Sequence, residues 1–140
     1  MSKQIFLNLP VQDLAKATAF YEALGFTKNP DFSGENGSAM MWSEDIVFML
    51  ITHEFYAKFT EKAIIDAKTA SGALIALSLN SKEEVQQFAD TAKANGGNWF
   101  EAEPNKNLDF MFGLEVTDLD GHQLEPFFMD LSTFADVNKI

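Results

Sequence analysis

The sequence lacks cysteine entirely and is poor in basic residues. Without thiols, the chain has no disulfides, thiolate metal ligands or thiol nucleophiles, and we expect a reducing, cytoplasmic compartment. Ten Lys and Arg residues stand against 21 Asp and Glu residues, which gives a formal net charge of −11. Because such a charge repels phosphate backbones and anionic lipids, we expect neither nucleic acid nor a membrane as a partner.

Long hydrophobic runs are also missing. The most apolar stretches, residues 46–51 and 72–79, are much shorter than the roughly 20 residues of a membrane-spanning helix. The first ten residues are too short and too interrupted to form the apolar core of a signal peptide. The chain does contain 46% hydrophobic residues, including 14 Phe, within 140 residues. These values predict a single domain over residues 1–140 with a substantial core.

A strand followed by an amphipathic helix begins the chain. Residues 5–11 alternate as a half-buried strand does, and the alternation places Phe6 and Asn8 on the face away from the helix. Asp13 is the predicted N-cap of that helix, and Gly25 is its predicted end.

The same unit occurs again after residue 72. Residues 74–79 form the second predicted strand, with Leu74, Ala76 and Ser78 on one face. Ser81 and Glu84 follow as a capping-box pair at the start of an apolar helical stripe that ends at residues 95–97. The sequence therefore predicts two copies of one βα unit.

Each copy continues into further strands. They are predicted over residues 39–42 and 46–52 in the first copy, and over 98–101, 110–116 and 123–129 in the second. Residues 34–37 and the Asp-Gly pair at 120–121 are predicted turns. The pattern is βαβββ given twice, as module one over residues 1–58 and module two over 72–131. Over residues 53–71, which overlap the end of module one and lead to module two, Phe55, Tyr56 and Phe59 predict a short helix that contributes to the core.

Three segments carry a family resemblance. Residues 8–13, 20–26 and 118–125 resemble the vicinal oxygen chelate superfamily, which includes glyoxalase I, the bleomycin resistance proteins and the extradiol dioxygenases. Residues 49–54 and 125–130 are most similar to a bacterial branch usually labelled predicted lactoylglutathione lyase. The resemblance implies an α+β fold in which two βαβββ modules form a cup-shaped, open mixed sheet with helices on its convex face. It also implies pairing as a homodimer.

The metal-binding members of this superfamily hold a divalent ion with four side chains in the cup, usually His or Gln, Glu, His and Glu. Carried over to this sequence, the four positions are occupied by Phe6, Met49 or Leu50, Leu74 and Glu125. Only Glu125 offers a ligand for a divalent ion. We therefore expect no metal cofactor. A displaced site for Ni²⁺ or Zn²⁺ on Asn8, His53 and Glu125 is the alternative.

The cup face supplies the candidate ligand pocket. Its predicted lining residues are Phe6, Asn8, Trp42, Leu50, Leu74, Ala76, Ser78, Phe110, Phe112 and Phe127. Glu125, the candidate catalytic residue, is expected among apolar neighbours that disfavour its charged form. It can then act as a base or anchor a basic ligand. The third alternative is that Glu125 has no function of its own and only forms a hydrogen bond with a neighbouring residue.

Three functions follow from these features. We expect a small-molecule binding or sequestering protein that works without a metal and takes a cationic or aromatic ligand. The first alternative is a metal-dependent enzyme similar to lactoylglutathione lyase. The second alternative is a metal-free enzyme with Glu125 as general base.

Overall fold

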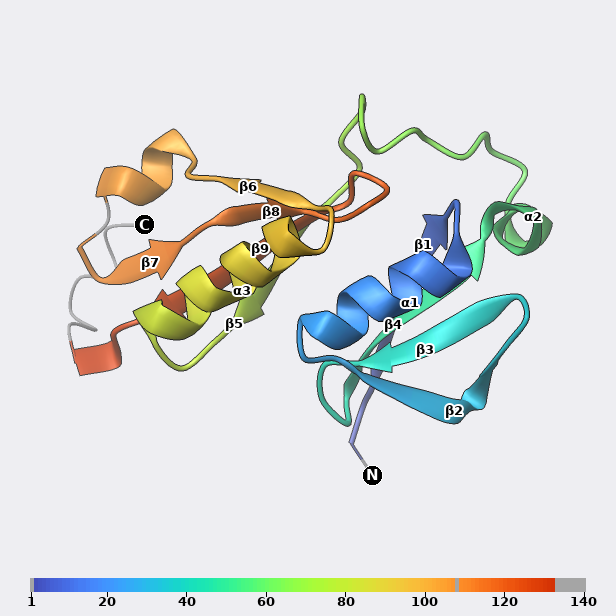
Figure 1. Ribbon diagram of the computed structural model, residues 1–140, viewed down its shortest axis with the longest axis horizontal. Coiled ribbons are helices and arrows are strands. Elements are labelled where there is room, and N and C mark those ends of the chain that lie inside the picture. The colour runs from blue at the N-terminus through green and yellow to red at the C-terminus, as the bar shows by residue number, and fades with distance from the viewer. Residues whose placement is uncertain (1, 108, 133–140) are drawn as a thin grey trace. The chain divides into compact units, whose positions relative to one another are not determined.

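A computed structural model gives the fold of the protein and describes residues 2–107 and 109–132 (Figure 1). The chain divides into two compact units, Met1–Gly72 and Ala73–Ile140. Each unit is one βαβββ module, so the predicted α+β class and the repeat are confirmed. The strands form two open mixed sheets, one in each module, and the described strands close into no barrel. No described helix has the length and apolar character needed to cross a membrane.

The first module is built on a four-stranded sheet. Its elements are β1 (Ile5–Val11), α1 (Leu14–Ala23), β2 (Thr27–Gly34), β3 (Gly37–Met41), β4 (Ile46–Thr52), α2 (His53–Tyr56) and the 3₁₀ turn η1 (Ala57–Phe59). The strand order is β1-β4-β3-β2. Strand β1 runs parallel to β4, and the other neighbours are antiparallel.

The core of this module lies between α1 and one face of the sheet. The Asp13 side chain caps the helix by accepting the Lys16 backbone N–H at 3.0 Å, as predicted. The fully buried Tyr21 ring makes edge contacts with Phe26 and Phe48, at centroid distances of 5.1 and 5.8 Å. These aromatic contacts, which bury large apolar surfaces, fix the helix on the sheet and leave the opposite sheet face free of it.

Strand β2 was not among the predicted strands. Its sequence contains Pro30 and Asp31, which are rare inside sheets, and it has no apolar alternation. The structure explains why these residues are tolerated: β2 is an edge strand, and its pairing with β3 is irregular between Asn29 and Gly34. An edge strand accommodates proline because one side of its backbone needs no ladder partner.

The second module repeats this plan. Its elements are β5 (Leu74–Ser78), α3 (Lys82–Ala94), β6 (Asn98–Phe100), the 3₁₀ turn η2 (Glu103–Asn107), β7 (Met111–Gly113), β8 (Glu115–Thr117) and β9 (Gln123–Met129). The sheet order is β5-β9-β8-β6, and β7 also pairs with β9. Strand β5 runs parallel to β9, as β1 does to β4. Helix α3 covers one face of this sheet (Figure 1).

The third strand of this module is one strand interrupted by its partner. Gly113 faces Phe127 and Val116 faces Leu124, so the register on β9 is the same on both sides of the break. By continuation, Leu114 faces Pro126, to whose carbonyl it donates at 3.1 Å. Because Pro126 has no N–H to return, the ladder breaks there into β7 and β8.

Replacing the cap of α3 tests the predicted capping box. The Ser81 hydroxyl accepts the Glu84 backbone N–H at 3.1 Å, and the Glu84 carboxylate accepts the Asn80 backbone N–H at 3.1 Å. We expect Ser81→Ala to lower the free energy of unfolding by about 1 kcal/mol in urea denaturation. The control, Ser71→Ala at an exposed site, is expected to stay within about 0.5 kcal/mol of the parent. Equal effects of the two changes would contradict a capping role.

Candidate functional site

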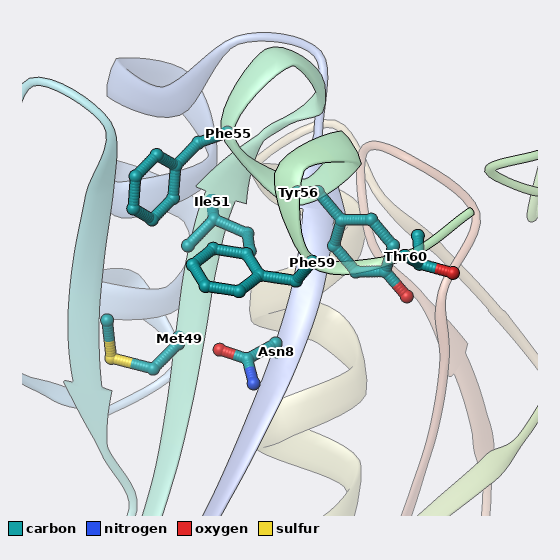
Figure 2. Close-up of a pocket in the computed structure, with 7 residues that line it drawn as sticks. All are labelled: Asn8, Met49, Ile51, Phe55, Tyr56, Phe59 and Thr60. Atoms are coloured by element: carbon teal, nitrogen blue, oxygen red, sulfur yellow. The ribbon is translucent and has the colours of Figure 1, made fainter. Parts of the chain in front are cut away.

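A pocket of about 290 Å³ lies on the face of the first sheet opposite α1. It is lined by Asn8, Met49, Ile51, Phe55, Tyr56, Phe59 and Thr60. Figure 2 shows Phe55, Tyr56, Phe59 and Thr60 on the segment that follows β4, and Asn8, Met49 and Ile51 on the strands beside it. One amide, two hydroxyl groups and four apolar side chains thus surround a space near the lower limit for small-molecule sites, which span roughly 300–1,000 Å³.

Two neighbouring strands supply the floor of this pocket. Asn8 of β1 and Met49 of β4 are direct partners in the parallel register. Side chains alternate along a strand, so residues before and after Asn8 turn to the helix, and Leu9 is 7% exposed there. The alternation that predicted Asn8 for the cup face also brings Met49 to it.

A short helical segment supplies the wall. Thr52 ends β4 and caps α2, because its hydroxyl accepts the Phe55 backbone N–H at 3.2 Å. The rings of Phe55 and Phe59 meet edge to face, with centroids 5.2 Å apart. The predicted short helix over this stretch is present as α2 and η1.

The prediction that this segment contributes to the core was wrong. No residue of α2 or η1 is buried, and Phe59 is 72% exposed. A single helical turn followed by a 3₁₀ turn has apolar partners on the sheet side only, so its rings stay partly in contact with solvent. Sequence reasoning therefore missed Phe55, Tyr56 and Phe59 as pocket residues. The available signal in the sequence was the position of these three aromatic residues directly after the end of a predicted strand.

The other pocket residues predicted in the first module lie elsewhere. Leu50 is fully buried and pairs with Ser38, whose hydroxyl contacts that of Thr18 on α1 at 2.8 Å, so Leu50 lies on the helix face. The half-buried Trp42 packs against Phe26 with ring centroids 5.1 Å apart and ring planes 47° apart, at the edge of that core. Phe6 lies one pleat before Asn8 on the same face, 49% exposed. Of the residues predicted here, the pocket contains Asn8 alone.

The predicted residues of the second module are distributed over two faces of its sheet. Alternation along β5 puts Leu74, Ala76 and Ser78 on the face away from α3, and all three are exposed. Phe127 pairs with Ser78 and shares this face, together with Glu125 beside Ala76. Phe112 lies two residues before the buried Leu114 and therefore on the same face, the one that packs against α3. Phe110 precedes β7 and is 4% exposed.

Glu125 has an acidic partner that sequence reasoning missed. The register that pairs Val116 with Leu124 places Glu115 directly opposite Glu125. Glu115 is 3% exposed, and its two carboxylate oxygens accept hydrogen bonds from Asn105 Nδ2 at 3.1 Å and from Gln123 Nε2 at 2.8 Å.

This pairing holds a proton on Glu125. The pKa of Glu125 is raised from its ordinary 4.5 to about 7, first by the hydrogen bond with Glu115, then by burial and by the negative charge of Glu115. Ionisation of Glu125 would remove its hydrogen bond with Glu115 and place a second negative charge beside that carboxylate, so Glu125 keeps its proton to higher pH. Near pH 7 the module therefore carries a carboxyl group that both donates and accepts protons.

The four superfamily ligand positions do not fit a metal ion. Phe6, Met49 and Leu74 offer no oxygen or imidazole donor, and Glu125 is bonded to Glu115. In residues 2–107 and 109–132, no three His, Asp or Glu side chains group in a way that can hold a metal ion.

Comparison with known proteins finds a family model that matches the N-terminal part of the chain and solved structures that share its fold. Residues 3–41 match the bleomycin resistance protein-like N-terminal family, a segment that contains β1, α1 and Asn8. A glyoxalase/bleomycin resistance protein/dioxygenase family enzyme from Burkholderia phytofirmans is 16% identical over 91% of this chain and 99% of that one, with a TM-score of 0.73. The match to this family model supports the resemblance to the vicinal oxygen chelate superfamily, and the solved structure shares the fold.

Two other solved structures extend the comparison. A hypothetical protein from S. aureus is 26% identical over 91% of this chain and 94% of its own, with a TM-score of 0.76. A fosfomycin resistance protein from Listeria monocytogenes, complexed with Mn(II) and sulfate, is 18% identical over 96% and 98%, with a TM-score of 0.68. No curated protein matches the sequence. These likenesses support the resemblance to glyoxalase/bleomycin-resistance-like proteins, while the resemblance to the predicted lactoylglutathione lyase branch stays a prediction.

Proposed function

We propose that this protein binds a small, largely apolar ring compound in the pocket of its first module and does so without a metal ion. The observation that carries the proposal is the pocket itself, in which the Phe55 and Phe59 rings face strand residues across a space of about 290 Å³. Exposed aromatic rings beside a cavity are surfaces on which a ligand can stack. Binding to them does not require the core to open.

Binding of a neutral fluorescent probe, N-phenyl-1-naphthylamine, tests this proposal. We expect saturable fluorescence enhancement with the wild-type protein. Phe59→Ala should weaken probe affinity about tenfold, because it removes one ring face from the ligand. Phe32→Ala is the matched control, since Phe32 is 67% exposed and lies outside the pocket. Equal affinity in the two variants would count against this pocket as the site.

A metal titration separates this function from that of a metal-dependent lyase. We expect Ni²⁺ and Zn²⁺ to give no saturable heat at one equivalent in calorimetry of metal-stripped protein, because three of the four superfamily positions are apolar. The Glu125→Gln variant should give the same trace. Tight stoichiometric binding that Glu125→Gln abolishes would contradict the metal-free proposal and favour the lyase alternative.

A second candidate function rests on Glu125. Its hydrogen bond with Glu115 gives it a pKa of about 7, which suits a group that exchanges protons at neutral pH. We propose it as the proton donor or acceptor if the protein is a metal-free enzyme. The pH dependence described in the Discussion tests the protonation state on which this candidate depends.

A further inference from the structure

The pocket of the first module has no Asp, Glu, His, Lys or Arg side chain in its lining. Its seven residues provide only one amide, from Asn8, and two hydroxyl groups, from Tyr56 and Thr60. A ligand charge buried among them would meet no counter-ion, and an unpaired buried charge is strongly unfavourable. The lining therefore favours a ligand whose inserted end is uncharged.

A positive charge is already present at the edge of the aromatic wall. Lys58 Nζ lies over the Phe55 ring, 5.8 Å from its centroid. A cationic ligand group that approached this ring would be repelled by the lysine, even though the net charge of the protein attracts cations at long range. The local charge thus opposes the cationic ligand that the overall composition favours.

The Asn8 amide is a polar group on the pocket floor that is available to a ligand. Its side chain has no hydrogen-bond partner among the residues that the structure describes. Figure 2 shows it projecting from β1 beneath the Phe59 ring. By contrast, the Thr60 hydroxyl already accepts the Lys62 backbone N–H at 3.1 Å. An amide offers one acceptor oxygen and two N–H donors, so it complements a group that also both donates and accepts.

We propose that Asn8 determines specificity in this pocket by selecting a planar ring ligand that carries an uncharged carboxamide. This inference rests on the proposed function, because it assigns the ligand class of the same pocket. The ring packs against Phe59, and the carboxamide exchanges two hydrogen bonds with the Asn8 amide. A carboxylate lacks the N–H donor, and an ammonium lacks the acceptor, so each makes only part of this pair.

Three naphthalene ligands with the same ring test the proposal: 2-naphthamide, 2-naphthoate and 2-naphthylmethylammonium. Each is measured by displacement of N-phenyl-1-naphthylamine from the full chain and by direct calorimetry. With wild-type protein we expect the carboxamide to bind about tenfold more tightly than either ion. Asn8→Leu should remove this preference, and Asn8→Asp should transfer it to the ammonium ligand. Asn98→Leu, the same change on an exposed residue of the second module, should leave the order unchanged.

The outcomes separate this inference from the proposed function. If the probe binds but the ammonium ligand binds best, or if Asn8→Leu keeps the carboxamide preference, the inference is wrong and the binding function stands. If neither the probe nor any ligand binds by calorimetry, both fail. Circular dichroism establishes that each variant is folded. If Asn8→Leu does not fold, Asn8→Asp, which has nearly the same shape, still decides the matter through its effect on the ammonium ligand.

Discussion

Phe48→Ala is expected to lower the free energy of unfolding of the first module by about 3–5 kcal/mol, the range for removing a buried aromatic ring. Phe48 is 1% exposed, and its ring lies 5.0 Å from that of Phe26 and 5.8 Å from that of Tyr21, measured between centroids. The change removes a ring from an aromatic cluster that fixes α1 on the sheet. Urea unfolding followed by the fluorescence of Trp42 measures the loss in this module, in a Trp99→Phe background.

The matched control is Phe32→Ala, which deletes the same ring from a position that is 67% exposed. We expect its unfolding free energy to stay within about 0.5 kcal/mol of the parent. The difference between the two variants isolates packing from the chemical change itself. A loss of less than about 1 kcal/mol for Phe48→Ala would contradict the aromatic core described for this module.

The stability of the second module is expected to fall as pH rises from 5 to 8. In the folded protein the pKa of Glu125 is about 7, whereas its ordinary value of 4.5 applies to the unfolded chain. The folded state thus binds this proton more tightly, so the contribution to stability is complete below pH 4.5 and disappears as pH rises through 7. Because Glu125 is only partly buried, solvent screening reduces the effect to about 1 kcal/mol.

Two variants assign this pH dependence to the carboxyl pair. Glu125→Gln removes the titrating group, and Glu115→Gln removes the hydrogen-bonding carboxylate that raises the pKa of Glu125. Both should flatten the difference between unfolding free energies at pH 5 and pH 8, measured through Trp99 fluorescence in a Trp42→Phe background. All other groups are common to the three proteins, so the comparison isolates the contribution of this carboxyl pair. A wild-type slope retained in Glu125→Gln would show that other groups cause it.

Local patterns predicted most of the fold because each is decided by nearby residues. The caps at Asp13 and Ser81 and the alternation around Asn8 depend on residues within one turn or one strand. Strand β2 could not be found in this way. Its residues are polar and include Pro30, and its position is fixed by pairing with β3 at the sheet edge.

The candidate sites were predicted less completely, since they depend on pairing between strands. The choice between Met49 and Leu50 as a cup-facing residue stayed open until the register with Asn8 assigned it to Met49. Glu115 becomes a neighbour of Glu125 only through the hairpin that joins β8 to β9. The predicted turn at residues 120–121 already implies that Glu115 and Glu125 are neighbours, because a hairpin turn determines which residues of its two strands face each other.

The parallel pairing of β1 with β4, and of β5 with β9, has a consequence for how the chain is made. As the polypeptide leaves the ribosome, β1 emerges first but has no partner until β4 follows, whereas β2, β3 and β4 are adjacent and can pair early. The first strand of each module therefore joins last, by closing a long loop, a step that makes folding slow. The entropy of that closure grows only logarithmically with length, so insertions between α1 and β2 should slow folding little.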